Sequence, residues 1–355
     1  QIHTSGTTGR PKGAMLTNAN IMALARHAET GDLGAWSPDD VILVPLPLFH
    51  SGGTCFSLYG LYVGATTCLT REPRPDQMFD AFRRAPITKA GFVPAVIQMI
   101  VNHPDFDRDK VRSLKMVYYG GAPITAALLE TAMEALGCGF LQMFGMTEST
   151  TAGTTLMPED HDVTRPELLT SCGRVNSDMQ LRIVDADRND LPRGESGEIA
   201  LKSPSIMKGY HNRPEDTAKV LVDGWYYTGD VGYLTEDGYL YIRDRLKDMI
   251  ISGGENIYPA EIEQALAPHP AVLESGVVGV PSAKWGEEVK ACVVLRPGQK
   301  ADADQIITHC RTLLAGFKCP KSVDFLDALP RNANGKILKR VLREPYWPKA
   351  GRQVG

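Results

Sequence analysis

The residues best suited to chemistry lie at the start of the chain. The segment Thr4-Ser5-Gly6-Thr7-Thr8-Gly9-Arg10-Pro11-Lys12-Gly13 contains four hydroxyls, three glycines, one Arg and one Lys. Glycines let backbone amides approach an anion closely, and hydroxyl and cationic side chains can donate to its oxygens. The spacing does not fit the Gly-x-x-x-x-Gly-Lys-Ser/Thr pattern of a P-loop. The segment therefore predicts a phosphate-binding loop of another kind.

A helix is expected to follow this loop. Thr17 or Asn18 can cap its first turn, apolar residues recur at helical spacing over 21–28, and Gly31 can end it. A loop that leads into the N-terminus of a helix is an arrangement that binds anions.

The next part of the chain alternates between apolar runs and helical patterns. The apolar runs are Val41–Leu46, Thr66–Leu69, Lys115–Tyr119 and Gly139–Met143. The helical patterns are Pro75–Arg84, Pro94–Asn102 and Ala126–Leu136. This alternation predicts α/β units with parallel strands.

One stretch in this part has no charged side chain. Between Val41 and Thr70 there is no Asp, Glu, Lys or Arg, which is long enough to span a bilayer as one helix. Pro45, Pro47, His50 and four glycines interrupt it. Because proline and glycine break helices, the stretch predicts buried strand and loop, and no transmembrane segment is expected.

The pattern changes after Ser171. Short alternating segments predict antiparallel strands at Gln180–Asp185, Gly197–Lys202 and Tyr239–Arg243. A compact unit follows from about Asp248, with helices at Pro259–Leu266 and Asp304–Ala315, strands at Val272–Val280, Glu288–Leu295 and Val323–Phe325, and a fraying tail after Lys339. We therefore expect an α/β protein with two parts. Residues 1–246 form a large α/β domain with a β-rich subdomain, and residues 247–355 form a small, mobile α+β domain.

Composition excludes several classes of protein. A chain of 355 residues with 43% hydrophobic and 23% charged residues is typical of a folded protein of about two domains. The net charge of −4 gives no general attraction to nucleic acid or to anionic membranes. The seven cysteines are scattered and lack a Cys-x-x-Cys pair, which favours reduced thiols and a cytoplasmic location over disulfides or zinc.

A series of segments, in order, resembles the motifs of the adenylate-forming superfamily: acyl-CoA synthetases, peptide-synthetase adenylation domains and firefly-type luciferases. After the loop at 4–13 come Pro47-Leu48-Phe49-His50, Gly120-Gly121-Ala122-Pro123, Phe144-Gly145-Met146-Thr147-Glu148 and Trp225-Tyr226-Tyr227-Thr228-Gly229-Asp230. Then follow Arg243-Asp244-Arg245-Leu246-Lys247-Asp248, Ser252-Gly253-Gly254-Glu255-Asn256 and Pro330-Arg331-Asn332-Ala333-Asn334-Gly335-Lys336. Family members carry a large N-terminal portion before the loop, so we expect the large domain to be incomplete here.

The resemblance implies an ATP site. The loop residues Thr4, Ser5, Gly6, Thr7, Thr8, Gly9 and Lys12 would hold phosphates, and Gly121, Ala122 and Pro123 with Phe144, Gly145 and Met146 would hold the adenine. Thr147 would bond the α-phosphate and Glu148 would contact Mg²⁺, a hard cation that prefers oxygen ligands. Asp230 would accept from the ribose hydroxyls, to which Arg245 can donate.

It also implies a catalytic lysine and a thiol site. Lys336 would bridge the carboxylate and the α-phosphate during adenylation, and the small domain would then turn about Lys247. Gly253, Gly254, Trp285 and Lys318 would then meet coenzyme A. Trp285 could instead be a surface anchor for the small domain. His50 would lie between the acyl pocket and the coenzyme A tunnel, or it could be a partly buried structural histidine.

The resemblance thus implies an acyl-CoA synthetase that uses ATP, Mg²⁺ and coenzyme A on a small carboxylic acid. Segments near Phe92–Gln98, Tyr119–Ile124 and Phe144–Thr151 would line the acyl pocket. The sequence of Lys247–Pro259 most resembles that of fatty-acid and aryl CoA ligases, which favours a medium- or long-chain fatty acid, while aryl and short branched acids stay open. Two alternatives stay open. One is an adenylation enzyme that loads a carrier protein, and the other is a nucleotide-binding fragment without turnover, for which a homo-oligomer is one expected state.

Overall fold

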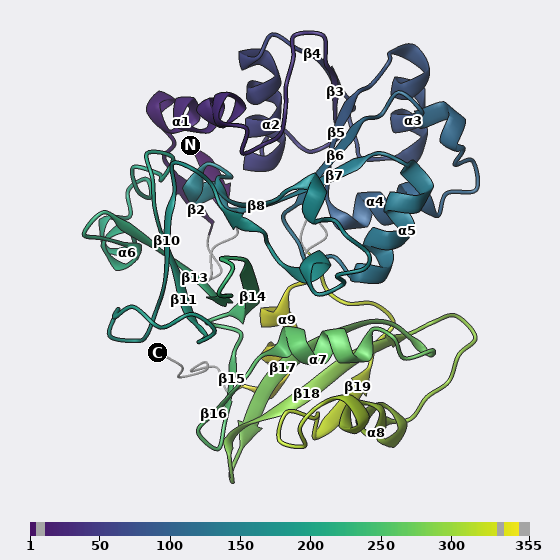
Figure 1. Cartoon of the computed structure of the whole chain (residues 1–355). Helices are drawn as coiled ribbons and strands as arrows, with labels where there is room; N and C mark the ends of the chain where they lie inside the picture. The colour runs from purple at the N-terminus through teal and green to yellow at the C-terminus, as the bar shows by residue number, and fades with distance from the viewer. Residues whose placement is uncertain (5–10, 332–336, 348–355) are drawn as a thin grey trace. The chain divides into compact units, whose positions relative to one another are not determined.

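The computed structural model describes residues 1–4, 11–331 and 337–347. The chain divides into two compact units, coloured purple to green and green to yellow in Figure 1. The first comprises Gln1–Thr228 and Gly232–Ile242, and the second comprises Gly229–Val231 and Arg243–Gly355. The middle of one strand, β13 (Trp225–Leu234), is therefore assigned to the second unit.

The main sheet of the first unit confirms the predicted α/β alternation. Its order is β4-β3-β5-β6-β7-β8-β9, parallel as far as β7 and antiparallel from there. The strands are β3 (Val41–Val44), β4 (Thr66–Leu69), β5 (Lys89–Phe92), β6 (Met116–Gly120), β7 (Gly139–Gly145), β8 (Gly153–Leu156) and β9 (Arg174–Val175). The central parallel strands β3, β5 and β6 are largely buried, as expected for strands covered on both faces, whereas the edge strands β4 and β9 are partly or fully exposed.

Helices cover both faces of this sheet. Figure 1 shows α1 (Asn18–Thr30) and α2 (Ser51–Tyr62) on one side and α3 (Pro75–Arg84), α4 (Pro94–Val101) and α5 (Ala126–Leu136) on the other. The helix ends follow local chemistry. Thr17 and Asn20 form a capping box at α1 and Gly31 ends it at φ 82°, while prolines start α3 and α4.

Helix α2 corrects the expectation of strand and loop between Val41 and Thr70. The glycines of α2 do not interrupt the helix. Two of them lie where the helix packs closely against neighbouring segments, with no room for a side chain. A Cβ at Gly53 would lie 2.4 Å from the Pro47 carbonyl oxygen, and one at Gly60 would lie 2.2 Å from the Ile42 Cδ1. Tertiary packing therefore overrides the low helix propensity of glycine here.

The phosphate loop also differs from expectation. The described residues on its two sides pair as antiparallel strands, β1 (Ile2–Thr4) and β2 (Lys12–Ala14), with Thr4 opposite Lys12. Because β2 separates the loop from α1, the loop does not lead directly into a helix N-terminus.

The β-rich part of the chain contains antiparallel strand pairs, as predicted. It comprises β10 (Gln180–Val184), β11 (Gly197–Lys202), β12 (Leu221–Val222), β13 and β14 (Leu240–Arg245), with α6 (Pro214–Val220) beside β12. Large apolar side chains of this region join a core with α1 and α2.

The second unit is an α+β structure. Strands β15 (Ile250–Ser252), β16 (Glu255–Ile257), β17 (Val272–Ser282), β18 (Gly286–Leu295) and β19 (Ser322–Phe325) pack with α7 (Pro259–Leu266), α8 (Ala303–Leu313) and α9 (Lys339–Arg343). The fraying tail expected after Lys339 is wrong for residues 339–347. Leu342 is buried, and the Trp347 indole donates to the Gly279 carbonyl at 3.0 Å. Within the described ranges, no helix is long and apolar enough to cross a bilayer.

Candidate functional site

The end of strand β7 positions the residues expected to meet the nucleotide. Phe144 and Gly145 end the strand, and Thr147 and Glu148 follow in a single 3₁₀ turn in which each is only 8% exposed. A Cβ at Gly145 would lie 2.1 Å from the Thr151 carbonyl oxygen, so this tight turn requires glycine. Thr151 itself has a left-handed φ of 66°, an uncommon conformation that often occurs at functional sites.

Helix α2 is linked directly to this turn. The hydroxyls of Ser51 and Thr147 lie 3.0 Å apart and are both buried. His50 occupies the N-cap position of α2, and its ring centroid lies 5.2 Å from that of Phe49. Ser51, which the sequence did not single out, is thus the α2 residue in contact with Thr147.

Tyr210 contacts two of the expected site residues, Glu148 and Lys12. The Tyr210 hydroxyl donates to Glu148 Oε1 at 2.8 Å, while the Lys12 ammonium lies 5.1 Å from the centre of the Tyr210 ring and 3.3 Å from Asp216. Burial and the neighbouring Glu148 carboxylate raise the pKa of Tyr210 above its ordinary value. Tyr210 therefore remains a donor that orients Glu148.

Glu148 fits the magnesium role. Mg²⁺ at nucleotide sites is commonly held by one or two carboxylates together with substrate phosphates and water. Glu148 offers one such carboxylate, and Tyr210 orients it. Among the residues that the structure describes, no group of three or more His, Cys, Asp or Glu side chains is placed to hold a metal by itself.

The other segment expected to hold the adenine, residues 121–123, lies at the carboxyl end of β6, next to the carboxyl end of β7. Gly120 ends β6 and pairs with Met143 of β7, and Gly121, Ala122 and Pro123 follow it as exposed residues. A Cβ at Gly120 would lie 2.3 Å from the Met143 carbonyl oxygen, and Gly121 has φ 78°. Parallel pairing therefore brings 120–123 next to 144–146, as a nucleotide site at the carboxyl ends of strands requires.

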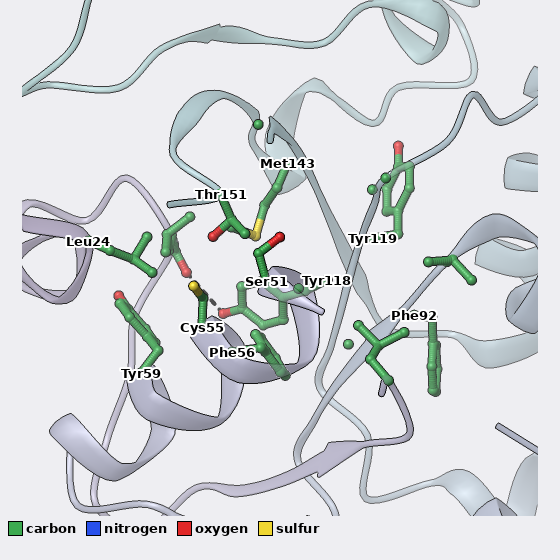
Figure 2. A pocket seen from close by; sticks show the side chains of 18 residues that line it. Leu24, Ser51, Cys55, Phe56, Tyr59, Phe92, Tyr118, Tyr119, Met143 and Thr151 are labelled. Carbon is green, nitrogen blue, oxygen red and sulfur yellow. Dashed lines mark hydrogen bonds between the residues drawn. The ribbon is translucent and has the colours of Figure 1, made fainter. Parts of the chain in front are cut away.

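A cavity of about 160 Å³ opens at this edge. It is lined by Gly120, Gly121 and Gly145 from the expected nucleotide segments and by apolar side chains including Leu24, Phe56 and Met143 (Figure 2). Phe92, Val93, Tyr119 and Thr151, from the segments expected to hold the acyl group, also line it. The sequence did not predict the contribution of α2, whose residues Ser51, Gly52, Cys55, Phe56 and Tyr59 form one wall.

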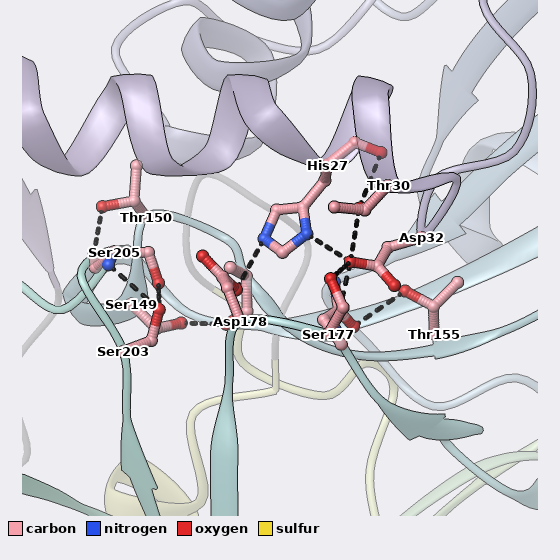
Figure 3. A network of polar contacts seen from close by, with 12 residues as sticks. His27, Thr30, Asp32, Ser149, Thr150, Thr155, Ser177, Asp178, Ser203 and Ser205 are labelled. Carbon is pink, nitrogen blue, oxygen red and sulfur yellow. Dashed lines mark hydrogen bonds and ion pairs between the residues drawn. The ribbon is translucent and has the colours of Figure 1, made fainter.

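A polar network, centred on residues that lie between the cavity-lining residues Leu24 and Leu33 in the sequence, joins the end of α1 to the β-rich region. His27 of α1 is 1% exposed, with Nδ1 2.7 Å from Asp32 and Nε2 3.2 Å from Asp178 (Figure 3). Asp32 also accepts from the Ser177 backbone amide at 3.1 Å and hydroxyl at 2.7 Å. The network therefore ties the end of α1 to the turn before β10, and no sequence motif indicated it.

The second unit holds the expected ribose residues. Asp230 is 4% exposed and forms an ion pair with Arg245, and the Leu246 amide donates to the Gly229 carbonyl at 2.8 Å. Lys247 follows, and burial is the main cause that lowers its pKa below the ordinary value.

The residues expected to meet coenzyme A fall into two places. Gly253 and Gly254, at φ 62° and 87°, form the two-residue turn between β15 and β16. Trp285 packs on this turn, since the Gly253 amide donates to its carbonyl at 2.8 Å and a Cβ at Gly253 would lie 2.9 Å from its ring. Lys318 lies elsewhere in this unit, paired with both Glu261 oxygens at 2.7 and 2.8 Å.

The expected phosphate loop and catalytic lysine fall largely outside the described part of the chain. Ser5, Gly6, Thr7, Thr8, Gly9 and Lys336 lie outside the described residues. Their neighbours Thr4 and Lys12 are described, and the Thr4 hydroxyl donates to the Lys12 carbonyl at 3.4 Å.

Comparison with known proteins identifies the family. Residues 1–211 match the family model of the AMP-binding enzymes, and residues 261–336 match that of the AMP-binding enzyme C-terminal domain. The fatty acid–[acyl-carrier-protein] ligase ScoC of Streptomyces coeruleorubidus is 40% identical over 100% of this chain and 68% of its own length. A feruloyl-CoA synthase of an Amycolatopsis species is 41% identical over 97% of this chain and 69% of its own.

A solved structure agrees with both the sequence match and the fold. ATP-bound MatB from Rhodopseudomonas palustris is 35% identical and superposes with a TM-score of 0.89, over 97% of this chain and 67% of that one. The resemblance noted in the sequence is thereby confirmed, as is the α/β architecture with a small second unit. The chain belongs to the AMP-binding enzymes, an adenylate-forming family.

Proposed function

We propose that this enzyme is an ATP-dependent acyl-CoA synthetase. A carboxylate oxygen of the acid attacks the α-phosphorus of ATP, pyrophosphate leaves, and an acyl adenylate forms. The thiol of coenzyme A then attacks the acyl carbonyl, and AMP leaves. One observation carries the proposal: a single cavity is lined both by Gly120, Gly121 and Gly145 at the expected nucleotide edge and by an apolar wall suited to an acyl tail.

The residues at this edge have complementary roles in the proposal. Thr147 would bond the α-phosphate, with its hydroxyl positioned by Ser51. Glu148, oriented by Tyr210, would hold the Mg²⁺ that accompanies the phosphates. The metal would offset the negative charge of the pyrophosphate. Lys12 and Lys336 supply cations, Asp230 and Arg245 serve the ribose, and the second unit turns about Lys247 between the two half-reactions.

The size of the cavity bears on the acid. One water needs roughly 10–15 Å³ of such volume, so about 160 Å³ corresponds to roughly 11–16 water-sized groups. A medium-chain fatty tail or an aryl tail matches this size.

The acceptor has a second candidate. ScoC, one of the relatives, is named for a carrier protein, so a carrier-protein thiol is the alternative to coenzyme A. Incubation with ATP, Mg²⁺ and an acid, together with either coenzyme A or a phosphopantetheinylated carrier protein, separates the two by mass spectrometry.

The location that we propose is the cytoplasm. All seven cysteines are free and five of them are buried. Burial raises the pKa of Cys55 to about 11, so its thiol is unreactive. Free thiols of this kind suit a reducing compartment.

The experiment that tests the function is product analysis. The enzyme is incubated with ATP, Mg²⁺, coenzyme A and a pool of aryl and fatty acids, and AMP, pyrophosphate and acyl-CoA are measured. We expect all three products, and Glu148→Gln should reduce them at least tenfold while the exposed control Glu195→Gln leaves them unchanged. ATP binding seen as a melting shift without AMP formation would instead support a fragment without turnover.

A further inference from the structure

One side chain in the proposed acyl cavity has an unused polar group. Tyr59 lines the cavity and is 3% exposed, and its hydroxyl oxygen is buried without a hydrogen-bond partner among the described residues. The other two tyrosines of the cavity are satisfied. The Tyr118 hydroxyl donates to the Leu33 carbonyl at 2.9 Å, and the Tyr119 hydroxyl lies 3.0 Å from the His161 Nε2. A buried hydroxyl left unpaired is costly, so Tyr59 is an exception that calls for a partner.

Close packing fixes the place of this hydroxyl. Residues 52, 55, 56 and 59 form the cavity face of α2, while Gly53 and Gly60 hold α2 close to the Pro47 carbonyl and the Ile42 side chain. The Tyr59 ring meets the Trp36 ring edge-on, with centroids 4.6 Å apart. Figure 2 shows Tyr59 at the end of the cavity that Leu24 also lines. The hydroxyl therefore cannot readily turn toward another partner.

The same helix relates this hydroxyl to the reaction centre. Ser51 contacts Thr147 at the start of α2, and Tyr59 follows eight residues later. At 1.5 Å per residue this is roughly 12 Å along the helix axis. An acid whose carboxylate lies at Thr147 would thus bring the far end of its tail toward Tyr59.

We propose that Tyr59 selects acids that carry an oxygen at the far end of the tail. The proposal rests on the proposed function, and it adds the class of tail. Burial is the main cause that raises the pKa of Tyr59, so the phenol stays protonated and donates to a tail hydroxyl or carbonyl oxygen. Phe56 and Tyr118, whose rings contact the same Trp36 ring that Tyr59 meets, give this part of the cavity aromatic walls, which favour an aryl ring as the carrier of that oxygen.

The first test compares acids that differ only in the distal oxygen. The aryl pair is 3-(4-hydroxyphenyl)propanoic and 3-phenylpropanoic acid, and the aliphatic pair is 8-hydroxyoctanoic and octanoic acid. We expect kcat/KM for AMP formation to favour the hydroxylated member of at least one pair by tenfold or more, and Tyr59→Phe to abolish that preference. Preference in the aryl pair identifies an aryl tail, and preference in the aliphatic pair alone identifies an aliphatic one. No preference in either pair, or a preference that survives in Tyr59→Phe, overturns the proposal.

A second test needs no turnover. If the Tyr59 hydroxyl is unpaired in the free enzyme, Tyr59→Phe should raise the melting temperature or leave it unchanged. Tyr118→Phe is the matched control, because it removes a paired hydroxyl from the same cavity and should lower the melting temperature. A fall for Tyr59→Phe as large as that for Tyr118→Phe would show a structural partner and refute the proposal. Absence of AMP formation with every acid would count against the proposed function, whereas the melting comparison reads the state of Tyr59 independently.

Discussion

The buried His27 provides a prediction whose size follows from the structure. Burial disfavours the charged imidazolium, but the hydrogen bonds and charges of Asp178 and Asp32 outweigh burial and raise the pKa of His27 from 6.5 to about 9. On the other side of the pair, burial opposes the charged form of Asp32, yet hydrogen bonds from His27, Ser177 and Thr30 hold its pKa well below the usual range. The charged network therefore stabilises the folded enzyme, and the contribution depends on pH.

The sign and size follow from linkage. A histidine whose folded pKa is raised contributes its full stability below the unfolded value of 6.5 and loses it as pH rises through about 9. At about 1.4 kcal/mol per pKa unit, the shift corresponds to about 3 kcal/mol. His27 lies in the first unit, which comprises Gln1–Thr228 and Gly232–Ile242. For a domain of this length, a loss of about 3 kcal/mol lowers the melting temperature by roughly 6–12 °C between pH 6 and pH 9.5.

The assay is thermal unfolding of the wild type and His27→Gln across this pH range. The wild type should exceed the variant most at pH 6, and the difference should shrink by about 3 kcal/mol as the pH rises. His161→Gln is the control. His161 is also buried, but burial lowers its pKa below 6.5, so it should not change the alkaline profile. Parallel curves for the wild type and His27→Gln, with a His27 NMR titration near 6.5, would refute the reasoning.

Three further predictions concern the proposed site. Tyr210→Phe removes a hydrogen bond to a charged group, so AMP formation should fall roughly 10–100-fold with little change in melting temperature; an unchanged rate in a kinetic assay would show that Glu148 needs no orienting donor. Gly145→Ala introduces a clash with backbone and should lower the unfolding free energy by at least about 1–3 kcal/mol, whereas Gly316→Ala, into open space, should leave the denaturation midpoint nearly unchanged. Lys336→Ala should slow acyl-adenylate formation roughly 10²–10³-fold but spare thioester formation from supplied acyl adenylate, and equal loss of both half-reactions would rule out its assigned role.

Local signals predicted the elements that depend on local chemistry. Two helices, Pro75–Arg84 and Ala126–Leu136, have the predicted bounds. A proline in the first turn marks the start of the former, and a threonine N-cap marks the start of the latter. Four of the five parallel strands followed from apolar runs, whereas β5 (Lys89–Phe92), which lies between β3 and β6, was not predicted. Helix α2 could not be predicted in this way, since its glycines serve contacts with Pro47 and Ile42 that are specified only by the fold.

The candidate site likewise contains residues that a sequence motif indicates and residues that only the fold brings together. Thr147 and Glu148 lie in a recognisable motif, so the sequence indicated them and the structure shows that they share one buried turn. Tyr210 lies 62 residues from Glu148 in the chain, and no spacing rule relates the two. The cavity wall at Tyr59 was missed because it depends on α2, although positions 52, 55, 56 and 59 would have shown a common face once a helix was assumed.

The split within strand β13 matters for any attempt to produce the second unit separately. Gly229–Val231 belong to that unit, although they precede Arg243 and are separated from it by eleven residues of the first unit. A fragment that starts at Arg243 would lose Asp230, the ion-pair partner of Arg245, and the Gly229 carbonyl that accepts from the Leu246 amide. The two units are therefore joined by three chain crossings, and a single protease cut between Ile242 and Arg243 would leave Asp230 attached to the wrong fragment.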